Sequence, residues 1–222
     1  NIISDSSQIY NITGTPDNNC SRHMYLFKEF SIIPKHCFSC YKVQIEIKTV
    51  IELIKLFIVF HNIKLINNNS RKCMIELRPY CKGFYKGFIY CSQLDEAHEI
   101  ASLIKRVTLL KIGQNVSIKI KRGCSEYALK FPEYAEIGKD KEFKMNYIDE
   151  WNSVEVQADI DNNNWLKANE LSKNFNLNSF LTIKNWIAYA QNIGDESVHK
   201  ITNKKVKAGF NIPEYYKKMR VI

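Results

Sequence analysis

The chain has 222 residues, of which 45% are hydrophobic, so it is long enough to bury a sizeable core. Its formal net charge is +9, but only six of the 32 basic residues are arginine, and this bias toward lysine is typical of an AT-rich coding sequence. The most apolar run, residues 50–66, is interrupted by Glu52, Lys55 and Lys64, which argues against a membrane span and a membrane partner.

The placement of the charges is more informative than their total. Residues 64–86 carry six basic side chains and one acidic side chain, and residues 105–130 carry seven and one. Residues 133–161 hold nine acidic side chains and three lysines, whereas residues 199–222 are basic again. The two basic segments and the basic tail are therefore the parts of the chain that favour contact with a polyanion.

Seven cysteines are an odd number, so a complete set of disulfides would leave one thiol over. Their spacing is uneven, and Cys37 and Cys40 form a close pair that suits reduced thiols or a metal better than a secreted disulfide framework. No signal peptide is visible. We therefore expect a cytoplasmic protein.

The sequence predicts seven segments. In chain order they are an irregular arm over residues 1–19, a strand over 41–47, a helix over 50–63, two strands over 72–78 and 85–91, a helix over 94–110 and a strand over 116–121. The first strand alternates cleanly, since Val43 and Ile45 point one way and Lys42 and Gln44 the other. Caps are expected at Thr49 for the first helix and at Ser92 for the second. A further helical stretch over 165–192 has a break near residues 176–178.

The order strand, helix, strand, strand, helix, strand predicts an α+β fold with a ferredoxin-like βαββαβ core, an antiparallel sheet with two helices on one face. We assign this core to residues 41–132. Residues 1–40 form an amino-terminal arm, and residues 133–222 form an acidic linker, a mostly helical extension and a basic tail.

A Cys/His knuckle is predicted in the amino-terminal arm. Cys20 and His23 form one pair, and Cys37 and Cys40 form a second pair after thirteen intervening residues. Two such pairs suit a tetrahedral, structural zinc ion, with His36 as a competing ligand. The alternative is that Cys37 and Cys40 are ordinary thiols beside a strand and that His23 is a surface residue.

A basic and aromatic sheet face is the candidate nucleic-acid-binding site. If Ile89 and Cys91 point into the core, Phe88 and Tyr90 point outward, where rings can stack on bases and cations can neutralise phosphates. The residues assigned to this site are Lys42, Arg78, Lys86, Phe88, Tyr90, Lys119 and Lys121.

The five residues from Lys86 to Tyr90, Lys-Gly-Phe-Ile-Tyr, resemble the start of the RNP1 signature of RNA-recognition motifs. That family carries this signature on its third strand, which is where the segment falls here. The resemblance implies RNA binding on the sheet face, and the sequence departs from the signature at Ile89, Cys91 and Gln93. The competing interpretation is that residues 133–222 pack over this face and make Phe88 and Tyr90 part of the core.

A cysteine-based active site is the third candidate. Its residues would come from Cys73, Cys81, Cys91, Cys124, His98 and Glu126. Cys124 follows two basic residues, whose charge could stabilise a thiolate. No nucleophile, base and orienting group occur at a familiar spacing, so the catalytic residues stay unassigned.

Three functions follow from these features. The leading prediction is a protein that binds RNA or single-stranded nucleic acid through the sheet face and the basic tail, where Tyr215 and Tyr216 stand among cations. The second is an enzyme that uses cysteine or metal chemistry in a pocket between the sheet and the carboxy-terminal region. The third is a structural subunit that docks onto a protein partner.

Overall fold

The structure is a computed structural model that describes residues 7–11, 19–78, 81–137, 143–162 and 175–203. These residues contain a five-stranded antiparallel sheet with the strand order β1-β3-β4-β2-β5. The strands are β1 (Gln8–Asn11), β2 (Tyr41–Ile47), β3 (Arg71–Ile75), β4 (Tyr85–Cys91) and β5 (Ser117–Arg122).

Helices surround this sheet. They are α1 (Cys20–Phe30), α2 (Val50–Asn62), α3 (Leu94–Lys111), α4 (Ser125–Lys130), α5 (Trp151–Asp161), α6 (Leu177–Asn192) and α7 (His199–Thr202), with 3-10 turns at Lys35–Ser39, Pro132–Ala135 and Glu196–Val198. Within the described ranges, no helix has the length and apolarity needed to cross a bilayer. The mixture of helices with an antiparallel sheet confirms the predicted α+β class.

The predicted order of elements is present from β2 to β5, with α2 and α3 as the two helices. Thr49 caps α2 as expected, because its side chain accepts a hydrogen bond from the Glu52 amide and the Glu52 carboxylate accepts one from the Thr49 amide. The cap of α3 differs from the prediction. The residue before this helix is Gln93, and Ser92 instead donates to the Glu96 carboxylate.

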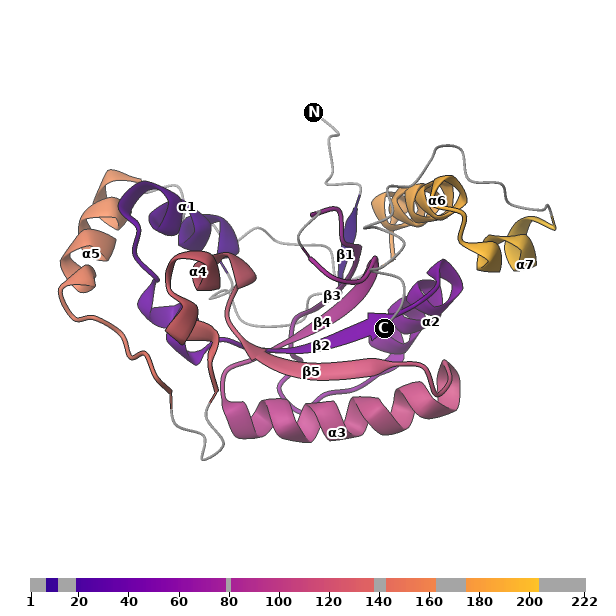
Figure 1. The fold of residues 1–222 in the computed structure, drawn as a ribbon, viewed down its shortest axis with the longest axis horizontal. Coiled ribbons are helices and arrows are strands. Elements are labelled where there is room, and N and C mark those ends of the chain that lie inside the picture. Colours follow the sequence, from indigo (N-terminus) through magenta and orange to yellow (C-terminus); the bar gives the residue numbers. More distant parts are fainter. Residues whose placement is uncertain (1–6, 12–18, 79–80, 138–142, 163–174, 204–222) are drawn as a thin grey trace.

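Helices α2 and α3 cover one face of the sheet, and Figure 1 shows α3 below it. Ile45 and Ile89 of the central strands are fully buried there with Leu53 and Leu56 of α2. Gly87 lies on the same face, and a Cβ atom at this position would stand 2.5 Å from a methyl group of Leu56. A glycine here lets α2 approach the sheet closely, so the central strands pack directly against this helix.

The amino-terminal segment differs from the expected irregular arm. Residues Gln8–Asn11 form β1, which pairs with β3 and adds a strand at the edge of the sheet. Trp186 of α6 is buried beside this edge, and its indole N–H donates to the Ser7 carbonyl at 2.8 Å. This edge is therefore held by residues from both ends of the chain, a pairing that no local pattern encodes.

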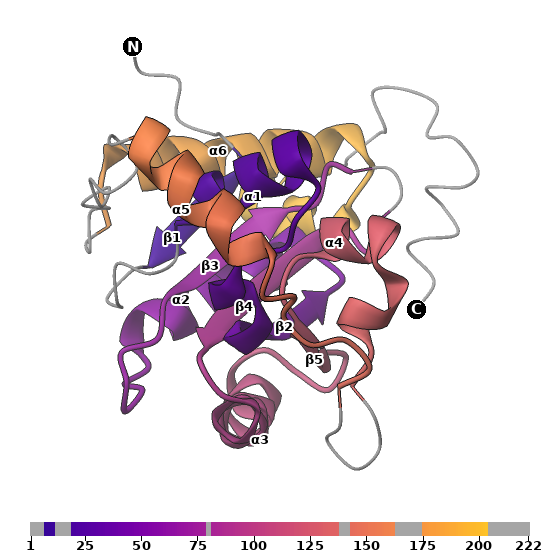
Figure 2. The ribbon, with the colours of Figure 1, turned by 90° about the vertical axis from the view of Figure 1, so that its left-hand side faces the viewer.

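The segment predicted as an acidic linker contains α5. Arg22 of α1 forms ion pairs with Glu155 at 3.0 Å and with Asp159 at 2.6 Å, and these pairs fasten α5 to α1. Figures 1 and 2 show α1, α4 and α5 together beyond one end of the sheet. Glu155 and Asp159 thus serve as partners for the half-buried Arg22 rather than as part of a solvated linker.

Candidate functional site

The strand register gathers the candidate residues on the face opposite α2 and α3. Lys42 of β2 lies directly across from Tyr90 of β4 on one side and from Lys121 of β5 on the other. Lys72 of β3 lies across from Phe88. Directly paired residues in an antiparallel sheet project to the same side, so three lysines surround two aromatic rings.

The two rings are buried and form the floor of the site. Phe88 is 5% exposed and Tyr90 is 6% exposed, and they pack with Cys40 and Met74 in a cluster separate from the main core. The outward direction predicted for them is confirmed, because Ile89 and Cys91 belong to the main core. They nevertheless do not form an open platform on the protein surface.

Three ammonium groups lie over these rings. Lys42 Nζ is 5.2 Å from the centre of the Tyr90 ring, and Lys72 Nζ and Lys121 Nζ are each 5.6 Å from the centre of the Phe88 ring. A cation within about 6 Å of a ring centre is attracted by the electron-rich face of the ring. The rings thus help to hold three like charges together.

The space above the rings is a cavity of about 320 Å³. Its described lining residues are Ser7, Gln8, Lys42, Lys72, Met74, Ile75, Glu76, Leu77, Arg78, Phe88, Tyr90, Lys121, Cys124, Ser125 and Glu126. They come from the face of the sheet, from β1 at one side, and from the start of α4 at the other side. None of these lining residues belongs to the segment 133–222, which the sequence suggested as the cover.

Cys124 reaches the cavity because of the backbone just before it. Gly123 adopts a positive φ of 51°, and a Cβ atom there would stand 1.9 Å from the Tyr134 hydroxyl oxygen. This left-handed turn, which the close Tyr134 hydroxyl reserves for glycine, brings the Cys124 thiol to 3.1 Å from Lys42 Nζ, which donates a hydrogen bond to it.

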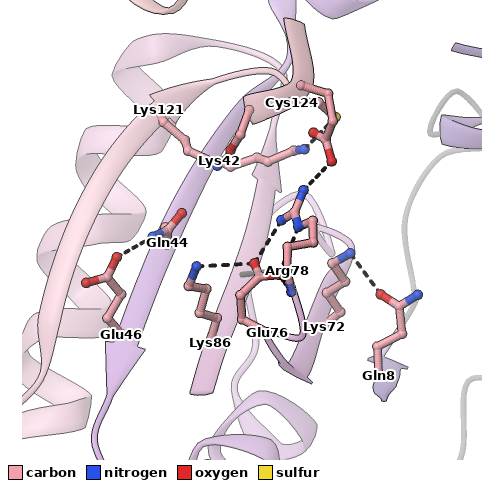
Figure 3. A network of polar contacts seen from close by, with 12 residues as sticks. Gln8, Lys42, Gln44, Glu46, Lys72, Glu76, Arg78, Lys86, Lys121 and Cys124 are labelled. Atoms are coloured by element: carbon pink, nitrogen blue, oxygen red, sulfur yellow. Dashed lines mark hydrogen bonds and ion pairs between the residues drawn. The ribbon is translucent and has the colours of Figure 1, made fainter. Parts of the chain in front are cut away.

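The carboxylates of the cavity are occupied by other cations, as Figure 3 shows for Glu76. Arg78 donates to both oxygens of Glu76 at 2.8 Å, and it also pairs with Glu126. Lys86 adds a contact to Glu76 at 3.2 Å. Burial acts to raise the pKa of Glu76, but the hydrogen bonds from Arg78 and the charge of Lys86 outweigh it and lower the pKa to about 2.

The three lysines over the rings have other acceptors. Lys72 donates to the Gln8 side-chain oxygen at 3.0 Å, and Lys121 donates to the Ser125 hydroxyl at 2.6 Å, while Lys42 donates to the Cys124 thiol. Figure 3 shows the amines of Lys42 and Lys72 and the acceptors Gln8 and Cys124 at the two sides of the site. None of these three acceptors is a carboxylate.

Crowding of these charges changes their titration. Burial, followed by the charge of Lys42, lowers the pKa of Lys72 to about 8 and that of Lys121 to about 8. Burial also acts to lower the pKa of Lys42, but contact with Cys124 and Tyr90 reverses this and raises it above the ordinary value. At neutral pH the cavity is therefore strongly cationic, and an anion is the ligand that relieves this charge.

Five of the seven residues assigned to the sheet face from the sequence line this cavity. They are Lys42, Arg78, Phe88, Tyr90 and Lys121. Lys86 lies beside the cavity and pairs with Glu76, whereas Lys119 is a largely exposed residue whose ammonium group is 3.5 Å from the Glu46 carboxylate.

The sequence analysis did not assign Lys72 to this face, although the alternation of its strand places it on the same face as Met74. The basic tail cannot be compared, since residues 204–222 lie outside the described residues.

The predicted zinc ligands do not assemble into a site. In the described part of the chain, no three His, Cys, Asp or Glu side chains are gathered closely enough to hold a metal ion. The Cys37 thiol lies 3.3 Å from the Tyr127 hydroxyl in an aromatic cluster, and burial raises its pKa. Burial also raises the pKa of Cys40 to about 11.

Within the described residues, the histidines near these cysteines do not join them in a group of three metal-binding side chains. His23 is buried and stacks on His36 with ring centres 5.2 Å apart. Burial and then the positive charge of His36 lower the pKa of His23 to about 3, so the imidazole is neutral. Cys20 begins α1 and is half-buried. Zinc remains a prediction that metal analysis of the purified protein would test.

The candidate catalytic residues are dispersed. Cys124 and Glu126 both line the cavity, whereas Cys73 and Cys91 are buried in the main core. His98 is exposed on α3, and α3 packs on the other face of the sheet. Cys81 is half-buried and is not among the described lining residues. Of the six candidates, Cys124 and Glu126 are thus the two that the described lining places in the cavity.

Comparison of the chain with protein-family models, with curated proteins and with solved structures finds no match.

Proposed function

We propose that the protein binds RNA or single-stranded DNA by taking phosphate and part of a nucleotide into the cationic cavity. The observation that carries this proposal is the convergence of Lys42, Lys72 and Lys121 over the Phe88 and Tyr90 rings. Ammonium groups neutralise phosphate, and the electron-rich rings beneath them help to hold the three cations together.

The cavity also has a suitable size. Its volume of about 320 Å³ is at the lower end of the range of roughly 300–1,000 Å³ that small-ligand sites occupy. Such a volume suits about one nucleotide rather than a folded nucleic acid. The proposed contact is therefore with single-stranded substrate, since a base in a duplex is not free to enter.

We further propose that β2 to β5 with α2 and α3 form a ferredoxin-like core. The antiparallel order β3-β4-β2-β5 and the placement of both helices on one face support it. In this arrangement the opposite sheet face remains for ligands, which is where the cavity lies.

Fluorescence anisotropy with a labelled twenty-nucleotide RNA, the matching DNA strand and the duplex tests nucleic-acid binding. We expect the single strands to bind at low salt, with Lys121→Met weakening the affinity by about 10-fold. Lys105→Met is the matched control, because Lys105 is exposed on α3, away from the cavity. Absence of binding at low salt, or equal weakening by both variants, would contradict the proposal.

A cysteine enzyme is the second candidate, favoured by the contact of Lys42 Nζ with the Cys124 thiol at 3.1 Å inside the cavity. A thiol beside an ammonium group, in a space that a ligand can enter, is the arrangement of a nucleophilic cysteine. Iodoacetamide at pH 7 should then modify Cys124 about 10-fold faster than Cys81, which is also half-buried. Equal rates at both thiols would remove this candidate.

A further inference from the structure

The shape of the cavity restricts which part of a nucleic acid can reach its floor. Ser7 and Gln8 stand at one side, and the residues from Cys124 to Glu126 stand at the other. With Phe88 and Tyr90 only 5% and 6% exposed, a strand cannot lie across the rings as it does on an open sheet. A chain end, in contrast, can enter with one nucleotide.

The charge of the cavity restricts the ligand further. Among the described lining residues, the carboxylates are Glu76 and Glu126, and both accept from Arg78, while Lys86 adds a second cation to Glu76. The ammonium groups of Lys42, Lys72 and Lys121 gather instead over the rings, where they donate to the uncharged side chains of Gln8 and Ser125 and to the Cys124 thiol.

An internal phosphodiester carries one negative charge and has neighbours on both sides. A phosphomonoester carries about −1.5 to −2 charges at pH 7 and presents three acceptor oxygens. Three converging ammonium groups therefore gain more from a phosphomonoester, because each can donate to a different oxygen and the repulsion among them is relieved more completely.

We infer that the cavity takes a terminal phosphomonoester, the phosphate at the end of a nucleic-acid strand or of a free nucleotide, in preference to an internal phosphodiester. This inference rests on the proposed function for the ligand class. It assigns to Lys42, Lys72 and Lys121 the role of a three-point phosphate clamp above the Phe88 and Tyr90 rings.

The test compares four single strands of one sequence that carry the same internal fluorophore: a 5′-phosphorylated strand, a 3′-phosphorylated strand, a strand with hydroxyls at both ends, and a closed circle. We expect one phosphorylated strand to bind about 10-fold more tightly than the strand with hydroxyl ends. The circle should bind no better than the latter. A nucleoside monophosphate should compete, and its nucleoside should not.

Two variants connect this preference to the clamp. Lys72→Met and Lys121→Met should each reduce the preference for the phosphorylated end to less than about 3-fold, whereas Lys105→Met should retain it. Circular dichroism of each variant establishes that it is folded. Because the first comparison uses the unaltered protein, its result does not depend on the folding of a variant.

The outcomes separate this inference from the proposed function. Equal affinity for all four strands would overturn the end-specific clamp and leave single-strand binding intact. Binding of the nucleoside monophosphate without binding of any strand would support the clamp and refute nucleic-acid binding. No binding of strands, monophosphate or inorganic phosphate would overturn both.

Discussion

Lys72 and Lys121 set the charge of the cavity, because both ammonium groups lie close to Lys42 and are partly removed from solvent. With pKa values of about 8, both lose their charge over a pH range in which an ordinary lysine keeps it. Most of the charge on these two groups is present at pH 7 and is lost by pH 9. The affinity of the cavity for an anion is therefore sensitive to pH.

We expect the affinity for a phosphorylated strand to fall by about 10-fold or more between pH 7 and pH 9. Bound phosphate raises the pKa of both amines, so binding near pH 8 should also take up protons. Anisotropy titrations at four pH values measure the first effect, and calorimetry in buffers of different ionisation enthalpy measures the second. An affinity that stays constant from pH 7 to pH 9 would contradict this assignment of charge.

Gly123 determines where Cys124 and the start of α4 lie. Gly123→Ala should destabilise the protein by about 2–4 kcal/mol, since it adds a strained backbone conformation and a clash with the Tyr134 hydroxyl. Gly83 also has a positive φ, of 75°, but a Cβ atom there would come no closer than 3.8 Å to the Lys86 side chain. Gly83→Ala should therefore cost only about 1–2 kcal/mol. Urea unfolding of both variants makes the comparison, and equal costs would refute the steric argument.

At the scale of elements, α1 and α5 are joined by a partly buried ion-pair cluster. Glu155 is buried and accepts from Arg22, from the Lys35 amide and from the Tyr147 hydroxyl. Removing its cation leaves a buried carboxylate without its charge partner, which is more costly than the loss of a surface pair. This cluster, together with the apolar contact of Leu26 with Ala158, holds α5 against α1.

Arg22→Met should lower the free energy of unfolding by about 2–4 kcal/mol, with the smaller value favoured by the partial exposure of Asp159. The double variant Arg22→Met with Glu155→Gln should recover part of this loss. Arg106→Met, at an exposed position on α3, serves as the control and should change stability by less than about 0.5 kcal/mol. Similar midpoints of urea unfolding for the two arginine variants would show that the cluster does not stabilise the fold.

At the scale of the whole molecule, the net charge of +9 and the local charge of the cavity make different contributions to binding. If the cavity holds one terminal phosphate with one to two negative charges, the logarithm of the binding constant should fall with the logarithm of salt concentration with a slope of about −0.7 to −1.4 for a single strand. Anisotropy titrations from 20 to 200 mM salt give this slope. A slope steeper than about −4 would indicate a broad basic surface instead of the cavity.

Much of the fold was determined by local sequence patterns. Strands β2, β3, β4 and β5 and helices α2 and α3 all form where period-two or period-3.6 patterning predicted them, within a few residues. The same patterns placed Phe88 and Tyr90 on the face away from the main core. They succeed because the direction of a side chain depends on its own backbone, whatever lies far along the chain.

Tertiary structure alone decided what covers the second face of the sheet. The walls of the cavity come from Gln8 in β1 and from Cys124 at the start of α4, which are more than a hundred residues apart in the chain. The alternation of β2 predicts a solvated polar face, yet Lys42, Gln44 and Glu46 are all buried. Burial depends on contacts between distant segments, and each segment's own pattern is compatible with many such contacts. The sequence thus determined which side chains share the face, and the packing of β1 and α4 against it made that face a cationic cavity.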